Sequence, residues 1–214
     1  MKKGWSVLVL TFGAVAILPL CATGPAFARA PKIDAPKAFK ADFTLEVGSN
    51  PPEHGTMYFS HGRIREEVAA TGGGPKPAEG GTKPAGGGPK KVTIIDPISK
   101  TIYLLDDDKK SFKVVPWDAR AALISQALQR FEKHRLLDTK TIDGQECQDF
   151  EIEPRDKDSK PFYLFVNKDT RFPVQLTTED PDPSKEVHIK WTNLSPGYQP
   201  AILFSPPLGY QETK

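Results

Sequence analysis

About eleven short segments in which apolar and polar residues alternate run from Phe39 to about Leu194, and one helical segment interrupts them. Successive side chains of a β-strand point to opposite faces, so this alternation predicts strands with one buried and one exposed face. We therefore expect a mainly β (α+β) fold, in which a single curved antiparallel sheet of about eleven strands forms a half-open barrel. The one helix is expected to pack in or over the concave face.

The expected strands fall into two groups, one before and one after the helix. The first strand has the clearest pattern, because its odd-numbered residues from Phe39 to Val47 are apolar and its even-numbered residues are polar. Asp143 and Gly144 form a tight-turn signal between two of the later strands. The predicted strands cover residues 39–47, 55–60, 63–68, 92–96, 101–106, 111–115, 134–142, 145–153, 161–167, 172–179 and 186–194.

The segment between the two groups has helical periodicity. Asp118 is a favourable N-cap residue and follows Pro116 and Trp117. Apolar residues then recur at helical spacing, which predicts a helix over residues 118–134 with one face against the sheet. That face consists of Ala121, Ile124, Leu128 and Phe131.

Residues 1–30 have the order of a bacterial export signal. Lys2 and Lys3 precede an apolar run over residues 5–20, and small residues then offer cleavage after Ala28 or Ala30. A retained membrane anchor is the alternative, but the run is short for a spanning helix. We therefore expect cleavage and a single mature domain over residues 31–214, in the periplasm or cell envelope.

The two cysteines bear on anchoring and on disulfides. Bacterial lipoprotein signals place a small residue before the lipidated cysteine, whereas Leu20 precedes Cys21. We therefore expect no lipid anchor at Cys21. Only Cys147 remains after cleavage, so the mature domain must be held together by its core rather than by disulfides.

Cleavage also changes the charge. The chain has 29 basic and 27 acidic residues, and loss of Lys2, Lys3 and Arg29 leaves 26 basic residues against the 27 acidic ones. A nearly neutral mature chain has no general attraction to nucleic acid or to anionic membranes. We therefore expect no nucleic-acid partner.

Two segments lack strand patterning. Residues 69–91 contain Gly-Gly-Gly-Pro-Lys twice and no aromatic or large aliphatic residue. This composition predicts a disordered insertion between two paired strands. It is no phosphate loop, since that motif needs Gly-Lys followed by Ser or Thr between a strand and a helix. Residues 195–214 are rich in Pro and Gly and are expected to form an extended tail.

No catalytic or metal-binding constellation stands out. None of the four histidines lies at metal-ligand spacing from another, and there is no Gly-x-Ser-x-Gly or Cys-x-x-Cys motif. Glu66 and Glu67 are strand neighbours and point to opposite faces, which prevents a shared acid-base site. The aspartates at 106–108 lack the glycine and glutamate of a calcium loop. We expect no enzyme activity, no cofactor and no metal.

Several motifs follow one another in a familiar order. After the signal peptide come a Phe-x-Ala-x-Phe strand, a Gly-x-Met-Tyr-Phe hairpin and an Arg-Ile-Arg-Glu-Glu strand. A longer motif, Ile-Ile-Asp-Pro-x-x-Lys-Thr-Ile-Tyr-Leu-Leu-Asp, spans residues 94–106, and Asp-Gly-Gln-Glu-Cys and Pro-Pro-Leu-Gly-Tyr begin at 143 and 206. Over nearly the whole mature part, the chain resembles the LolA-like superfamily of bacterial envelope proteins.

This resemblance implies a half-open antiparallel barrel with helices in or over its opening. Some family members carry lipoprotein acyl chains across the periplasm, and others bind lipids or act as stress sensors. The chain departs from the carriers in having one convincing helix rather than several. The glycine-rich insertion has no counterpart, and the resemblance transfers no specific ligand residue.

Two functions remain open at this stage. The first is a carrier or chaperone that binds an acyl chain or lipoprotein lipid in an apolar cup, since each buried methylene adds roughly 0.8 kcal/mol. The alternative is a structural or regulatory envelope protein that acts through protein partners without a small ligand. The residues predicted to line the cup are Phe43, Leu45, Phe59, Ile94, Leu104, Ile124, Leu128, Leu164, Leu176 and Trp191.

Overall fold

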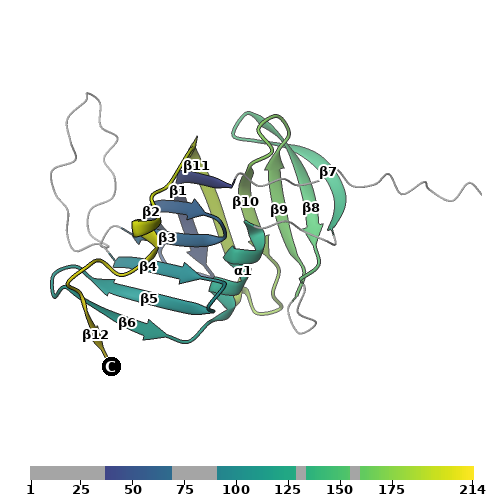
Figure 1. Cartoon of the computed structure of the whole chain (residues 1–214). Helices are drawn as coiled ribbons and strands as arrows, with labels where there is room; N and C mark the ends of the chain where they lie inside the picture. Colours follow the sequence, from purple (N-terminus) through teal and green to yellow (C-terminus); the bar gives the residue numbers. More distant parts are fainter. Residues whose placement is uncertain (1–36, 69–90, 129–133, 155–159) are drawn as a thin grey trace, which may run out of the picture.

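The computed structural model describes residues 37–68, 91–128, 134–154 and 160–214. It is mainly β, as predicted, and all eleven expected strands are present (Figure 1). The strands are β1 Ala38–Val47, β2 Glu53–Ser60, β3 Arg63–Val68, β4 Lys91–Asp96, β5 Thr101–Asp106, β6 Ser111–Val115, β7 His134–Ile142, β8 Gln145–Ile152, β9 Phe162–Asn167, β10 Pro173–Thr178, β11 Val187–Pro196 and β12 Gln211–Thr213. One α-helix, α1, spans Ala119–Ala127, and two 3₁₀-helices are η1 Pro183–Lys185 and η2 Ala201–Phe204.

All twelve strands belong to one sheet in the order β12-β6-β5-β4-β3-β2-β1-β11-β10-β9-β8-β7. Strands β1 to β6 and β7 to β11 form two antiparallel meanders, and β1 pairs with β11 where they meet. Strands β12 and β7 are the two edges, so the sheet is open rather than closed. This confirms the predicted half-open barrel.

The C-terminal segment corrects the prediction of an extended tail over residues 195–214. Strand β11 continues to Pro196, η2 follows, and β12 pairs with β6 in parallel. Gln211 N–H donates to the Lys110 carbonyl at 3.0 Å. The sequence gives little sign of β12, because all three of its residues are exposed and backbone pairing alone defines it.

Helix α1 begins where predicted. The Asp118 carboxylate accepts a hydrogen bond from the Ala121 backbone N–H at 2.7 Å and so caps the helix. The predicted end at residue 134 is wrong, because His134 is the first residue of β7 and pairs with Ile152. The apolar spacing continues past Leu128 without Gly or Pro, so the sequence contains no stop signal. Phe131 lies outside the described residues.

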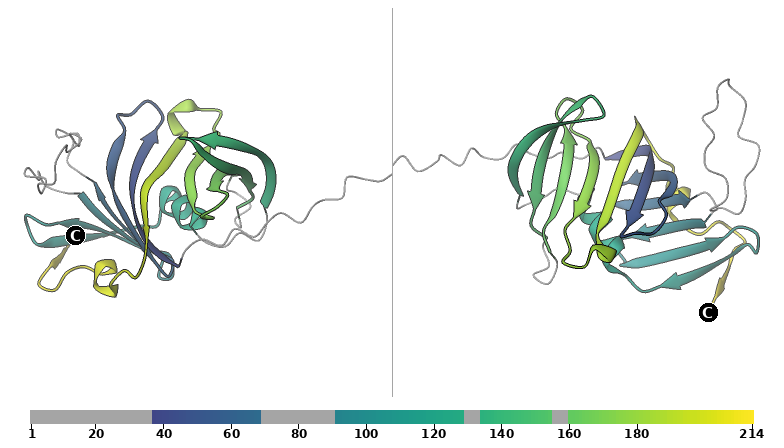
Figure 2. Two further views of the ribbon diagram at one scale, coloured as in Figure 1. Left: turned by 90° about the horizontal axis from the view of Figure 1, so that it is seen from above. Right: turned by 180° about the vertical axis from the view of Figure 1, so that it is seen from behind.

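The chain order places α1 across the opening of the sheet. Strand β6 lies next to one edge and β7 forms the other, so the segment that joins them must cross from one meander to the other. Figure 2 shows α1 between the two arms of the curved sheet. The helix therefore packs over the concave face, which we call the inner face, as predicted.

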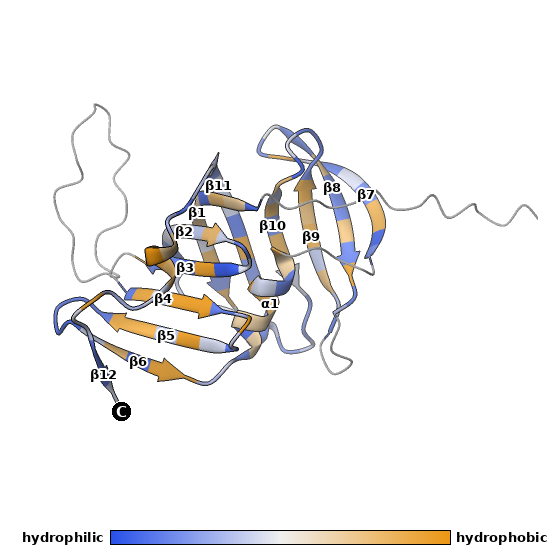
Figure 3. Cartoon of the chain, in the orientation of Figure 1, coloured by the Kyte–Doolittle hydropathy of each residue, from blue (hydrophilic) through white to orange (hydrophobic). Residues whose placement is uncertain are grey.

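The main hydrophobic core lies on the inner face. It joins both meanders to α1, and Phe39 is its aromatic centre, with ring centroids 5.1 Å from Phe59 and 4.7 Å from Phe172. Figure 3 shows apolar residues on strands of both arms. A second, smaller cluster on the opposite face is covered by the C-terminal segment and consists of Val92, Ile94 and Leu105, with Tyr103, Phe112 and Tyr210 packed against it.

The predicted signal peptide, including Cys21, lies outside the described residues. So does the predicted insertion, except for Lys91, which begins β4. Val68 and Lys91 are paired in the sheet, so the two ends of the insertion are neighbours.

Candidate functional site: the apolar inner face

The inner face brings together nine of the ten residues predicted to line a cup. Eight of them belong to the main core, and Leu104 packs against it while partly buried. They come from six strands of both meanders, from α1 and from its C-cap residue, Leu128. The eight are Phe43, Leu45, Phe59, Ile124, Leu128, Leu164, Leu176 and Trp191.

Ile94 is the exception, and its prediction as a cup residue is wrong. Its side chain belongs to the second cluster, on the opposite face, whereas the neighbouring Ile95 belongs to the main core. Residues 92–95 of β4 are all buried, because the C-terminal segment covers the outer face of this strand. Alternation cannot assign a face to a strand that is buried on both sides.

Trp191 and Met57 connect the two meanders on the inner face. Trp191 Nε1–H points at Met57 Sδ, at 3.4 Å. A buried indole N–H needs an acceptor, and a thioether is a weak one. This pair therefore lets a large aromatic side chain lie in an otherwise apolar surface.

Glu66 is an inner-face residue that is not apolar and was not among the predicted cup residues. Glu66 lies between Ile64 and Val68 on β3, and its side chain is only 1% exposed. The alternation of Ile64 and Val68 places position 66 on the same face, so the signal was available in the sequence. Thr93, also buried, is its cross-strand partner on β4.

Glu66 forms the ion pair that joins the sheet to α1. Arg120 Nη2 donates to Glu66 Oε2 at 2.6 Å. Burial raises the pKa of Glu66 above its ordinary value, although the charge and hydrogen bond of Arg120 act in the opposite direction. Among the described residues, Glu66 Oε1 and Arg120 Nε are buried without a hydrogen-bond partner.

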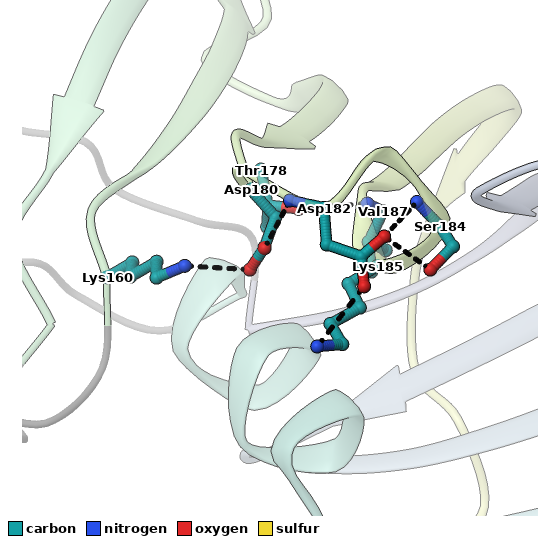
Figure 4. Close-up of polar contacts among 7 residues, drawn as sticks. All are labelled: Lys160, Thr178, Asp180, Asp182, Ser184, Lys185 and Val187. Carbon is teal, nitrogen blue, oxygen red and sulfur yellow. Dashed lines mark hydrogen bonds and ion pairs between the residues drawn. The ribbon is translucent and has the colours of Figure 1, made fainter.

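The acidic pair Asp180 and Asp182 serves a structural purpose. Lys160 Nζ lies 2.8 Å from Asp180 Oδ2, and Asp182 Oδ1 accepts from Ser184 N–H and Oγ–H at 3.1 and 2.6 Å (Figure 4). These hydrogen bonds lower the pKa values of both carboxyl groups. Both aspartates thus stabilise the loop between β10 and β11 in their charged form, which does not suit proton transfer at neutral pH.

The loop between β10 and β11 packs against the turn after β1. Gly48 N–H donates to the Glu186 carbonyl at 2.9 Å. A Cβ atom at Gly48 would lie 2.5 Å from the Ser184 carbonyl oxygen, and Gly48 also has a positive φ of 56°. Glycine is therefore required here both for space and for backbone conformation.

Cys147 is buried on β8, and burial raises the pKa of its thiol. A raised pKa keeps the thiol protonated, whereas a nucleophile requires the thiolate. In the part of the chain that the structure describes, no group of three or more His, Cys, Asp or Glu side chains is placed to hold a metal ion. No described helix combines the length and apolar character needed to cross a membrane.

Comparison with known proteins places the fold but gives no close relative. No family model and no curated protein matches the sequence. A solved structure of an uncharacterized conserved protein from Thermus thermophilus aligns with 83% of this chain and 90% of that chain, at 12% identity and a TM-score of 0.50. At this identity the match shows a shared fold alone.

Two further structures are more distant. A LolA superfamily protein from Nitrosomonas europaea aligns with 79% of this chain and 90% of its own, at 9% identity and a TM-score of 0.41. MucB, in the Pseudomonas aeruginosa MucA/MucB complex, aligns with 77% of this chain at 17% identity and a TM-score of 0.40, and the alignment spans about half (53%) of that chain. A LolA superfamily protein is thus among the structures that align with this chain.

Proposed function

We propose that this protein is an exported carrier or chaperone of the bacterial envelope that holds an apolar chain between α1 and the inner face of the sheet. An acyl chain of a lipid or lipoprotein is the ligand that suits such a surface. One observation supports this above all: the apolar inner face of an open sheet is covered by a nine-residue helix that lies in the chain between β6, next to one edge, and β7, at the other edge.

The free energy gained by packing α1 on the inner face is comparable to that gained by burying an acyl chain there. A nine-residue helix is marginal in isolation, so packing must hold α1 in place. Two large and fully buried side chains, Ile124 of α1 and its C-cap residue Leu128, contribute about 1.5–3 kcal/mol each. A buried methylene contributes about 0.8 kcal/mol, so roughly five methylenes offset both side chains. An acyl chain of ordinary length would therefore compete with α1 for the inner face.

Ile94 and Ile95 offer a matched test of this proposal. They are adjacent on β4, both are buried, and they face opposite sides of the sheet. Ile95→Ala and Ile94→Ala each leave a cavity and should each lower the free energy of unfolding by about 2–5 kcal/mol. Only I95A should tighten binding of the neutral fluorescent probe N-phenyl-1-naphthylamine, because its cavity adds room on the inner face.

Equal effects of I95A and I94A on probe affinity, or no probe binding by the native protein, would contradict the proposal. The I94A variant controls for general loosening of the sheet, since it has the same chemistry on the same strand. Mass spectrometry of lipids that co-purify with the protein would then identify the natural chain.

The alternative, a partner protein in place of a small ligand, has support on the C-terminal segment. Tyr198, Ile202 and Leu208 lie close together in the sequence and are largely exposed. Contiguous exposed apolar patches are typical of protein interaction sites, and these three side chains would contribute to such a patch. A partner that is captured by the native chain and lost on serine substitution of all three residues would favour this function.

A further inference from the structure

The ion pair between Glu66 and Arg120 lies at the boundary between the inner face and solvent. The Glu66 side chain is 1% exposed and that of Arg120 is 28% exposed. Arg120 is the second residue of α1 and is followed by the buried residues Ala121 and Ile124. Its guanidinium group is therefore next to the apolar core and still within reach of a charged group in water.

We propose that Arg120 binds the anionic headgroup of a single-chain amphiphile, a carboxylate or phosphate, whose tail lies on the inner face. This inference rests on the proposed function and specifies its ligand. The carrier would thus take charged amphiphiles in preference to neutral lipids of the same chain length.

The incomplete pairing of Arg120 is the first support. A guanidinium group and a carboxylate commonly form two parallel hydrogen bonds, and here one is made. Arg120 Nε is buried without a partner in the described structure, and so is Glu66 Oε1. A headgroup with two or three acceptor oxygens would satisfy the open donor, which a hydroxyl group with one oxygen does less well.

Charge is the second support. The guanidinium group is cationic and lies in the first turn of α1, where the helix dipole also favours an anion. The first turn contains no acidic residue after the Asp118 cap. Glu66 competes with the headgroup for Arg120. Because burial opposes the charged form of Glu66, a headgroup that is better solvated should be the stronger partner of Arg120.

Displacement of N-phenyl-1-naphthylamine by dodecanoate, dodecyl phosphate and 1-dodecanol tests the inference. The native protein should bind either anion about tenfold or more tightly than the alcohol, the usual effect of a charged hydrogen bond. Arg120→Gln should abolish this preference, and R120K should keep part of it. Glu66→Gln should tighten binding of both anions several-fold, because it removes the competing carboxylate, and should leave the alcohol unchanged.

The controls separate this inference from the proposed function. Acetate at the same concentration should not displace the probe, since it has a headgroup but no tail. Equal affinity for dodecanoate and 1-dodecanol, or a preference for the anions that survives in R120Q, would overturn the headgroup site. Neither result would contradict binding of an apolar chain to the inner face. Failure of the probe and of all three amphiphiles to bind would overturn the proposed function itself. The thermal transition of each variant shows that it is folded, and E66Q tests the site with Arg120 in place.

Discussion

At the scale of single residues, Glu66 is the side chain most at odds with its surroundings. It lies on an apolar face, is almost fully buried and has one partner, Arg120, on a different element. Burial of a charged carboxylate is unfavourable unless it is fully paired, and one of its oxygens has no partner in the described structure. A residue of this kind is expected to weaken the fold at neutral pH.

We predict that Glu66→Gln reduces the pH dependence of stability. Because the pKa of Glu66 is raised in the folded state, the folded protein binds the proton more tightly than the unfolded chain. Its contribution to stability is therefore present at acidic pH and lost as the pH rises from the ordinary glutamate range through the raised pKa. The charged groups that act on it are Arg120, Glu53 and Lys91.

Urea denaturation of the native protein and of E66Q across this pH range measures the effect. The native free energy of unfolding should fall relative to that of E66Q as the pH rises. E212Q, which removes a carboxylate from the exposed strand β12, is the control. Parallel curves for the native protein and E66Q would show that the pKa of Glu66 is not raised.

Residue-level prediction succeeded where strands are buried on one side only. Phe43 and Leu45 on β1 were assigned correctly to the inner face because polar residues alternate with them. The prediction for Ile94 was wrong because β4 is covered on both faces. Glu66 was not among the predicted cup residues, which are all apolar, although its position in the strand places it on the inner face.

At the scale of elements, the C-terminal segment is the main feature that the sequence did not predict. Arg65 Nη1 donates to the Leu203 carbonyl at 3.2 Å, and the Arg63 guanidinium lies 5.6 Å from the centre of the Phe204 ring. Tyr210 Oη–H donates to Asp107 Oδ1 at 2.6 Å. These contacts link residues more than one hundred positions apart, so no local pattern could reveal them.

Phe204 and Ile202 test whether this segment supports the sheet. Both lie in η2, but Phe204 is 3% exposed and Ile202 is 66% exposed. Phe204→Ala should lower the free energy of unfolding by about 3 kcal/mol, because it leaves a cavity against β3 and β4. Ile202→Ala should change it by less than about 0.5 kcal/mol. If chemical denaturation gives equal changes in the free energy of unfolding for the two variants, the C-terminal segment lies on the sheet without stabilising the fold.

At the scale of the whole molecule, the order of the strands determines where a ligand can lie. The two meanders join at β1 and β11, and α1 lies between the two arms of the sheet (Figure 2). Among the described residues, the apolar side chains of α1 and the ion pair between Arg120 and Glu66 hold the helix against the sheet. Eleven of the twelve strands and the start of α1 could be predicted from the sequence, whereas β12 depends on long-range contacts.

The central claim is that an apolar chain binds against the inner face, and Trp191 can report this directly. Trp191 is buried in the main core, and Trp117 packs against it. Tryptophan occurs three times, at positions 5, 117 and 191, and position 5 lies in the predicted signal peptide. In the protein without residues 1–30, Trp117→Phe therefore leaves Trp191 as the only tryptophan.

The decisive measurement is the fluorescence of Trp191 during titration with dibromostearate, with stearate as the control. Bromine quenches tryptophan only at short range. We predict that dibromostearate quenches Trp191 in a saturable way and that stearate does not. Displacement of N-phenyl-1-naphthylamine by dibromostearate without quenching of Trp191 would mean that the acyl chain binds elsewhere. An absence of binding would mean that the inner face is only a hydrophobic core. Either result would contradict the claim.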